Sequence, residues 1–111
     1  MDELLSLERV RFEVIPVKSS DGKALLPRNI SILPKNSWVT VTCSEASGGI
    51  DATIKTAKRL KEKGVVPVAH IPGRIVRDTS HLRAIADQLQ DADIGDIFVI
   101  GGDMTPPVGK F

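Results

Sequence analysis

Residues 38–70 read WVTVTCSEASGGIDATIKTAKRLKEKGVVPVAH, and this stretch decides the fold class. It begins and ends with apolar runs rich in β-branched residues, at residues 38–42 and 65–70. The apolar positions between the two runs recur at helical spacing: Ile50, Ile54, Ala57 and Leu60. A strand, an amphipathic helix and a second strand in this order predict a parallel βαβ unit.

Two further apolar runs flank this unit, at residues 11–15 and 96–100. All four runs are mostly continuous in apolarity, which is typical of parallel strands covered on both faces. They start near residues 12, 38, 66 and 97, with separations of 26, 28 and 31 residues, close to the roughly 30 per unit of a (β/α)₈ barrel. We therefore expect an α/β fold with about four parallel strands and flanking helices. The spacing is compatible with a partial (β/α)₈ TIM barrel and with a small flavodoxin-like, doubly wound sheet, and four strands suit an open sheet better than a closed barrel.

Local signals mark the ends of the predicted helices. Gly48 and Gly49 precede the first helix, and Gly64 ends it. The second helix is predicted from apolar positions with the same spacing: Leu82, Ile85, Ala86 and Leu89. Thr79 or Ser80 is the expected N-cap of this helix, which should end near Ala92.

Other parts of the chain are less regular. The Asp-Gly pair at residues 21–22 and the prolines at 27 and 34 break residues 18–36, which we expect to be mostly loop. Residues 2–8 could form a short leading helix. The 111 residues form one domain (1–111), which is under half of the roughly 250 residues of a complete barrel.

Composition excludes several classes of protein. The chain has 41% apolar and 26% charged residues and a net charge of +1, with no basic stripe, so we expect no nucleic-acid partner. Cys43 is the only cysteine, which excludes an intrachain disulfide and a clustered-thiolate metal site and fits a reducing, cytoplasmic setting. No apolar run approaches the roughly 18 residues of a membrane span. We expect no metal and no membrane partner.

Four polar residues lie in or just after the predicted strands, where parallel α/β folds place their ligand sites: Glu13, Thr42, His70 and Asp103. Glu13 stands inside an apolar run, and partial burial would raise its pKa toward the range of a general acid. A salt bridge to Arg11 or to a lysine is the alternative. Asp103 follows Gly101 and Gly102, a pair that lets the backbone approach a ligand closely or simply ends a strand with a turn.

The remaining candidates also have structural interpretations. A histidine that closes an apolar strand, such as His70, is often a structural residue rather than a ligand. Thr42 could cap a helix or pack by its methyl group. Cys43 has no basic neighbour in the sequence, so we expect a small buried residue rather than a nucleophile.

Four short motifs, in order and at barrel spacing, resemble the methylenetetrahydrofolate reductase family. FEVIP at residues 12–16 is similar to the family's first-strand FEFFP, and WVTVT at 38–42 to its second-strand FVSVT. AHI at residues 69–71 is similar to the third-strand PHL. IGGD at residues 100–103, followed by two prolines, is similar to the fourth-strand LRGD. The resemblance covers nearly the whole chain, and it implies that residues 1–111 are the N-terminal half of a (β/α)₈ TIM barrel.

The resemblance implies a function and roles for these residues. The family reduces 5,10-methylenetetrahydrofolate to 5-methyltetrahydrofolate, with FAD relaying hydride from NADH or NADPH. By position, Glu13 would be the general acid that protonates the folate, and Asp103 would act beside both the flavin and the pterin. Thr42, His70 and Gly102, together with Asp103, would line the flavin. Methylenetetrahydrofolate and NAD(P)H would be the substrates.

Two departures from the family motifs qualify this expectation. Gly101 stands where the family has an arginine that contacts the flavin nucleotide, so a cationic anchor for FAD is missing. Cys43 and Ser44 replace an aromatic-glycine pair. The alternative is therefore a non-catalytic half-barrel that binds folate or flavin or serves in assembly. In either case we expect the isolated chain to be inactive, and to form a homo-oligomer or to require a second half of the barrel.

Overall fold

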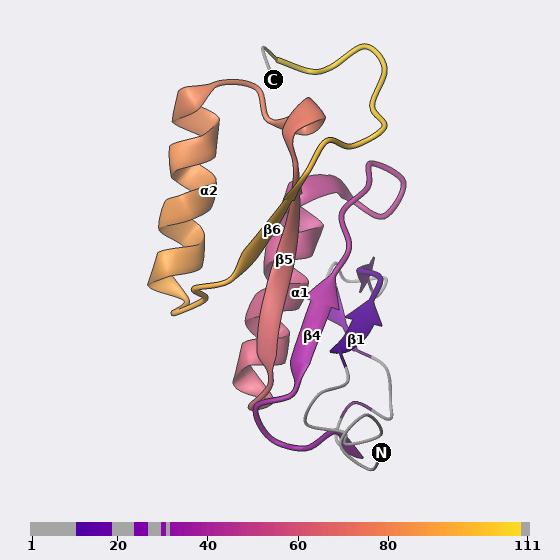
Figure 1. Ribbon diagram of the computed structural model, residues 1–111, viewed down its shortest axis with the longest axis vertical. Helices are drawn as coiled ribbons and strands as arrows, with labels where there is room; N and C mark the ends of the chain where they lie inside the picture. Colours follow the sequence, from indigo (N-terminus) through magenta and orange to yellow (C-terminus); the bar gives the residue numbers. More distant parts are fainter. Residues whose placement is uncertain (1–10, 19–23, 27–29, 31, 110–111) are drawn as a thin grey trace, which may run out of the picture.

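The main sheet follows the order of the chain. The computed structural model describes residues 11–18, 24–26, 30 and 32–109, and in these residues four strands pair in parallel. From one edge to the other they are β1 (Arg11–Val14), β4 (Trp38–Val41), β5 (Val66–Pro72) and β6 (Ile97–Ile100) (Figure 1). All four were predicted, each to within two residues at either end. The flavodoxin-like alternative is wrong, because its strand order does not follow the chain.

Both helices lie on the same face of this sheet. α1 (Gly49–Glu62) joins β4 to β5, and α2 (Thr79–Asp91) joins β5 to β6. Their buried residues share one core with the strands, and this core includes Ile54 and Leu60 of α1, Ile85 of α2 and Val39 of β4. The sheet is therefore singly wound, because a doubly wound sheet would carry helices on both faces. Neither helix of the described chain has the length and apolarity needed to cross a bilayer.

The helix boundaries agree with the prediction at three of the four ends. α1 begins directly after Gly48, whose φ of 105° is left-handed, and Gly64 follows its C-terminus with φ of 88°. α2 ends at Asp91, but its N-cap is Asp78, so the choice of Thr79 or Ser80 was wrong. The extended backbone of Asp78 lets its carboxylate accept the His81 N–H at 2.8 Å, a bond that only the N-cap residue itself makes.

The segment expected to be mostly loop contains a small second sheet. β2 (Val17–Lys18) and β3 (Ala24–Leu25) pair antiparallel, and both lie against α1. Strands of two residues carry too little periodicity to be recognised in a sequence. The predicted helix at residues 2–8 lies outside the described residues.

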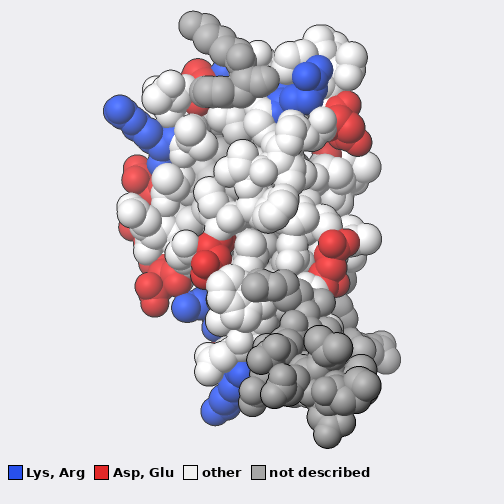
Figure 2. Space-filling view, in the orientation of Figure 1, with Lys and Arg blue, Asp and Glu red and all other residues white. Residues whose placement is uncertain are grey.

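One face of the main sheet is left uncovered by the described chain. α1 lies behind the strands in Figure 1, and Figure 2 shows the opposite face, a strip of mostly uncharged side chains with charged residues along its margins. Phe98 of β6, which lies on this face beside His70, is 57% exposed. The expectation of strands covered on both faces is therefore wrong for this part of the protein, because both helices pack on one side.

A matched pair of isoleucines tests this account of the core. Ile54 is 1% exposed and Ile32 is 75% exposed. We expect Ile54→Ala to lower the free energy of unfolding by about 2–5 kcal/mol, because the deleted atoms leave a cavity. Ile32→Ala should change it by less than about 0.5 kcal/mol. Urea unfolding followed by circular dichroism measures both values, and equal effects would contradict the assigned core.

Candidate functional site

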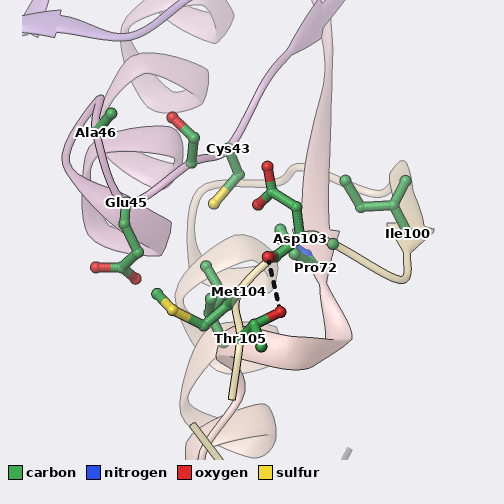
Figure 3. Close-up of a pocket in the computed structure, with 11 residues that line it drawn as sticks. Cys43, Glu45, Ala46, Pro72, Ile100, Asp103, Met104 and Thr105 are labelled. Atoms are coloured by element: carbon green, nitrogen blue, oxygen red, sulfur yellow. Dashed lines mark hydrogen bonds between the residues drawn. The ribbon is translucent and has the colours of Figure 1, made fainter. Parts of the chain in front are cut away.

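A cleft of about 550 Å³ opens at the carboxyl ends of the strands. Its walls come from the loop after β4, the end of β5 and the segment after β6 (Figure 3). The lining residues are Cys43, Ser44, Glu45, Ala46, Pro72, Ile75, Ile100, Gly102, Asp103, Met104 and Thr105. In Figure 3 the sulfur of Cys43 and the carboxylate of Asp103 come from different segments and turn toward the same space. Of the predicted site residues, Gly102 and Asp103 line this cleft.

Gly102 brings the chain close to β5 at the floor of the cleft. Its φ is +88°, a left-handed conformation, and a Cβ placed on it would lie 2.9 Å from the Cβ of Pro72. Both the conformation and the contact require glycine. The close approach is to Pro72 of the protein itself, and the approach of a ligand to the glycine pair stays a prediction. The adjacent Gly101 has no such constraint, since a Cβ there would meet nothing within 4 Å.

Arg74 fixes the path of the segment that carries Asp103. Its backbone N–H donates to the Gly101 carbonyl at 3.1 Å, and its Nε donates to the Met104 carbonyl at 2.6 Å. The Val108 N–H donates to the Arg74 carbonyl at 2.8 Å. Asp103 is exposed between the first two of these bonds, so its carboxylate is presented from a held backbone. We did not predict this role of Arg74, because its partners are backbone groups 27–34 residues away that carry no sequence signal.

Thr42 joins three elements at the edge of the cleft without lining it. Its N–H donates to the Val14 carbonyl at 3.1 Å, and its hydroxyl lies 3.5 Å from the same oxygen. The hydroxyl of Thr53, which is fully buried in α1, donates to the Thr42 carbonyl at 2.9 Å. These bonds tie the end of β4 to β1 and to α1, so Thr42 has a structural role in addition to any contact with a ligand.

Cys43 is half-buried in the cleft wall. Burial raises the pKa of its thiol above 9.0, and the Glu45 carboxylate raises it further, against an opposing contribution from the Thr53 hydroxyl. A raised pKa leaves little thiolate near neutral pH, which agrees with the prediction that Cys43 is not a nucleophile.

Glu13 and His70 lie on the uncovered face of the sheet and not in the cleft. Glu13 pairs in register with Thr40, and its side chain is exposed. The expected partial burial of Glu13 is therefore wrong, because no element of the described chain covers this face. His70 is half-buried and its ring lies 5.4 Å from that of Phe98, at an angle of 38°. The two predicted catalytic residues, Glu13 and Asp103, thus occupy adjoining parts of the sheet: the open face and the carboxyl edge.

The charge of the cleft bears on what it can bind. Two carboxylates line it, those of Glu45 and Asp103, and its described walls hold no lysine, arginine or histidine. Carboxylates accept hydrogen bonds from the N–H groups of a planar heterocycle, and a volume of this size suits such a ring system.

The described residues contain no group of three His, Cys, Asp or Glu side chains that could hold a metal ion. No protein-family model matches the chain.

Adjacent glycines provide a test of how the cleft is built. We expect Gly102→Ala to lower the free energy of unfolding by about 1–3 kcal/mol, through the left-handed backbone and the contact with Pro72. Gly101→Ala should lower it by less than about 0.5 kcal/mol, since its Cβ would meet open space. Chemical denaturation of the two variants makes the comparison. A Gly101→Ala protein as destabilised as Gly102→Ala would contradict the geometry described for this segment.

Alkylation of Cys43 tests the direction of its pKa shift. At pH 8 we expect iodoacetamide to label the folded chain several-fold more slowly than the chain in urea, because burial disfavours the thiolate. The folded-state pKa is raised, so this contribution to stability is present below pH 9.0 and is lost as the pH rises through the folded-state pKa. Faster labelling of the folded chain would show that the pKa is lowered instead.

Proposed function

We propose that this chain supplies four units of a (β/α)₈ barrel that reduces 5,10-methylenetetrahydrofolate with NAD(P)H through FAD. The winding of the sheet supports the half-barrel, and the four motifs that resemble the family support the reaction. Four parallel strands in chain order, with both helices on one face, are what half of such a barrel requires. In that arrangement the uncovered face would form the inner wall of the barrel. Glu13 and His70 would project from this wall, and Asp103 would stand at its carboxyl rim.

The roles of the side chains follow from these positions. Glu13, on the inner wall, would donate the proton that opens the bridged ring of the folate. Asp103, exposed on a backbone held by Arg74, would accept hydrogen bonds from ring N–H groups at the rim. His70 and Thr42 would stand beside the flavin. FAD, when bound, would supply the hydride relay between NAD(P)H and folate.

The described residues suit the ring system of FAD better than its pyrophosphate. The cleft has room for a planar ring system, and its carboxylates suit a ring that presents N–H groups. A pyrophosphate, in contrast, needs cationic partners, and no lysine or arginine lines the cleft. Gly101, in the place of the family arginine, is the residue that would have supplied such a charge. We therefore expect weak FAD binding by the chain as it stands.

The missing cation also favours a second candidate function. A half-barrel without a nucleotide anchor could bind a folate or a flavin, or serve in assembly, without turnover. Restoring the charge distinguishes a flavin site from a subunit that only assembles. A flavin site, with or without turnover, should gain FAD affinity, whereas a subunit that only assembles should not respond.

A pair of glycine-to-arginine variants tests the proposal. Gly101 and Gly95 lie at opposite ends of β6, and a Cβ at either position meets nothing within 4 Å. We expect Gly101→Arg to tighten FAD binding about tenfold or more, the value of one charge-assisted hydrogen bond. Gly95→Arg adds the same charge at the wrong end and should leave FAD binding unchanged. Titration of FAD into each protein, followed by flavin fluorescence, gives the affinities.

The outcomes separate a flavin-binding site from a subunit that only assembles. Glu13→Gln should retain the FAD affinity of the parent chain, because its proposed role is proton transfer and not binding. If no variant binds FAD, and calorimetry shows no binding of methylenetetrahydrofolate, the reductase proposal is wrong. Equal gains from Gly101→Arg and Gly95→Arg would indicate attraction by net charge alone.

A further inference from the structure

In the part of the chain that the structure describes, β6 pairs only with β5 and forms an open edge of the sheet. The Ala69 N–H donates to the Asp96 carbonyl, so residues 96, 98 and 100 turn their peptide groups toward β5. The peptide groups of Ile97 and Val99 therefore point to the free edge. These residues are also 49% and 68% exposed, and the strand carries no charged residue. An edge that is apolar and uncharged is a template for pairing with another strand.

α2 extends past β6 at this edge of the sheet. Ile85 and Leu89 of α2 are buried against the sheet, but Leu82, from the same apolar stripe, is 42% exposed. The helix stands to the side of β6, beyond the edge of the sheet (Figure 1). A groove of about 180 Å³ remains between them, with Leu82 and Val99 in its apolar lining. At this edge, part of the apolar stripe of α2 therefore has no strand of the described chain to pack against.

The opposite edge of the sheet, at β1, lacks a covering helix in the described residues. In the described chain β1 pairs only with β4, and β2 and β3 follow it where a barrel unit would have a helix. The Thr42 N–H donates to the Val14 carbonyl, so alternate residues of β1 bond to β4 and the peptide group of Glu13 points to the free edge. This edge offers a strand without a covering helix of its own.

We infer that two copies of this chain close on each other, with β6 of each copy paired in parallel to β1 of the other. A two-fold axis parallel to the strands makes both contacts at once, and the helix stripe exposed at each β6 edge covers the β1 strand of the partner. The eight strands form one closed ring, which removes both edges and encloses the mostly uncharged faces seen in Figure 2, with Glu13 of each copy inside the ring. Edge-to-edge pairing of two β6 strands, with the helices of both copies on one face, would instead bring the two α2 helices against each other, since each α2 stands beside its own β6.

The available surface agrees with a dimer of this kind. The exposed parts of Leu82, Ile97, Phe98 and Val99 amount to roughly 400 Å² in each copy, on the basis of about 150–250 Å² for a large side chain. A two-fold dimer buries this edge in both copies, so the two edges together contribute roughly 800 Å² of buried surface. The β1 edges and the enclosed faces add to this area, and a stable interface buries about 1,200–2,000 Å². Assembly stops at two copies because each contact pairs one β6 edge with one β1 edge, and two copies use all four edges. The inference concerns assembly only and does not depend on the proposed chemistry.

A proline at the free edge tests the inference. Val99→Pro removes an N–H that faces the partner and should leave the bonds to β5 intact. Val99→Thr keeps both the N–H and the β-branched shape, and serves as the control. Light scattering after size exclusion, at 10 to 100 micromolar protein, should give twice the 12.0 kDa of one copy for the parent chain and for Val99→Thr. Val99→Pro should be a monomer, with a dissociation constant raised at least tenfold.

A second edge variant distinguishes closure from other modes of association. Glu13→Pro removes the outward N–H of β1 and should also give a monomer. An equimolar mixture of the Val99→Pro and Glu13→Pro proteins retains one intact edge of each type, so association should reappear, more weakly than in the parent. Two copies stacked only by their open faces would not show this complementation.

Several results would overturn the inference. A parent chain that is monomeric over the whole concentration range rejects it, and so does a mass that keeps growing beyond two copies. If Val99→Pro does not melt cooperatively, Val99→Lys replaces it, because a charge in the groove should dissociate the dimer without changing the backbone. A dimer that survives both substitutions also rejects the inference. FAD binding by a monomeric chain would leave the proposed function standing while rejecting this assembly.

Discussion

The burial of α1 against β4 and β5 is the contact on which the rest of the structure depends. Parallel neighbours need a crossover, and the crossover helix must bury its apolar stripe on the sheet it spans. Ile54 and Leu60 of α1 and Val39 of β4 are almost completely inaccessible to solvent. Because α2 follows the same hand and packs on the same side, the helices leave the other face open. The proposed roles of Glu13 and His70 both depend on that asymmetry.

The strands and α1 could be predicted because their signals are local and repeated. Apolar runs and a helical stripe arise from the same burial that forms the core, so each residue of the pattern reports on the same face. The N-cap of α2 was placed one residue late, because Asp78, Thr79 and Ser80 can all cap a helix and the backbone conformation selects among them. β2 and β3 were missed because a pair of two-residue strands has no period to detect.

The candidate site was predicted only in part, since its geometry comes from contacts between distant segments. The sequence places Gly102 and Asp103 after a strand, and the structure puts both in the cleft. It does not reveal that Arg74 holds their segment through two backbone carbonyls. Glu13 was expected to be partly buried because its neighbours in sequence are apolar. Its exposure is decided by what covers the opposite face of the strand, which is a property of the tertiary structure.

Gly101 and Gly102 show how a structure separates two residues that a sequence presents as equivalent. Gly102 is required by its left-handed backbone and by its contact with Pro72, so the fold alone explains its identity. Gly101 has neither constraint, and a side chain there would enter open space. The fold therefore leaves position 101 free to carry a cation, and the glycine found there is not a requirement of the backbone. The identity of residue 101 therefore depends on what the neighbouring cleft binds. A site that lacks a cation at this position should favour the planar ring of a ligand over its phosphates.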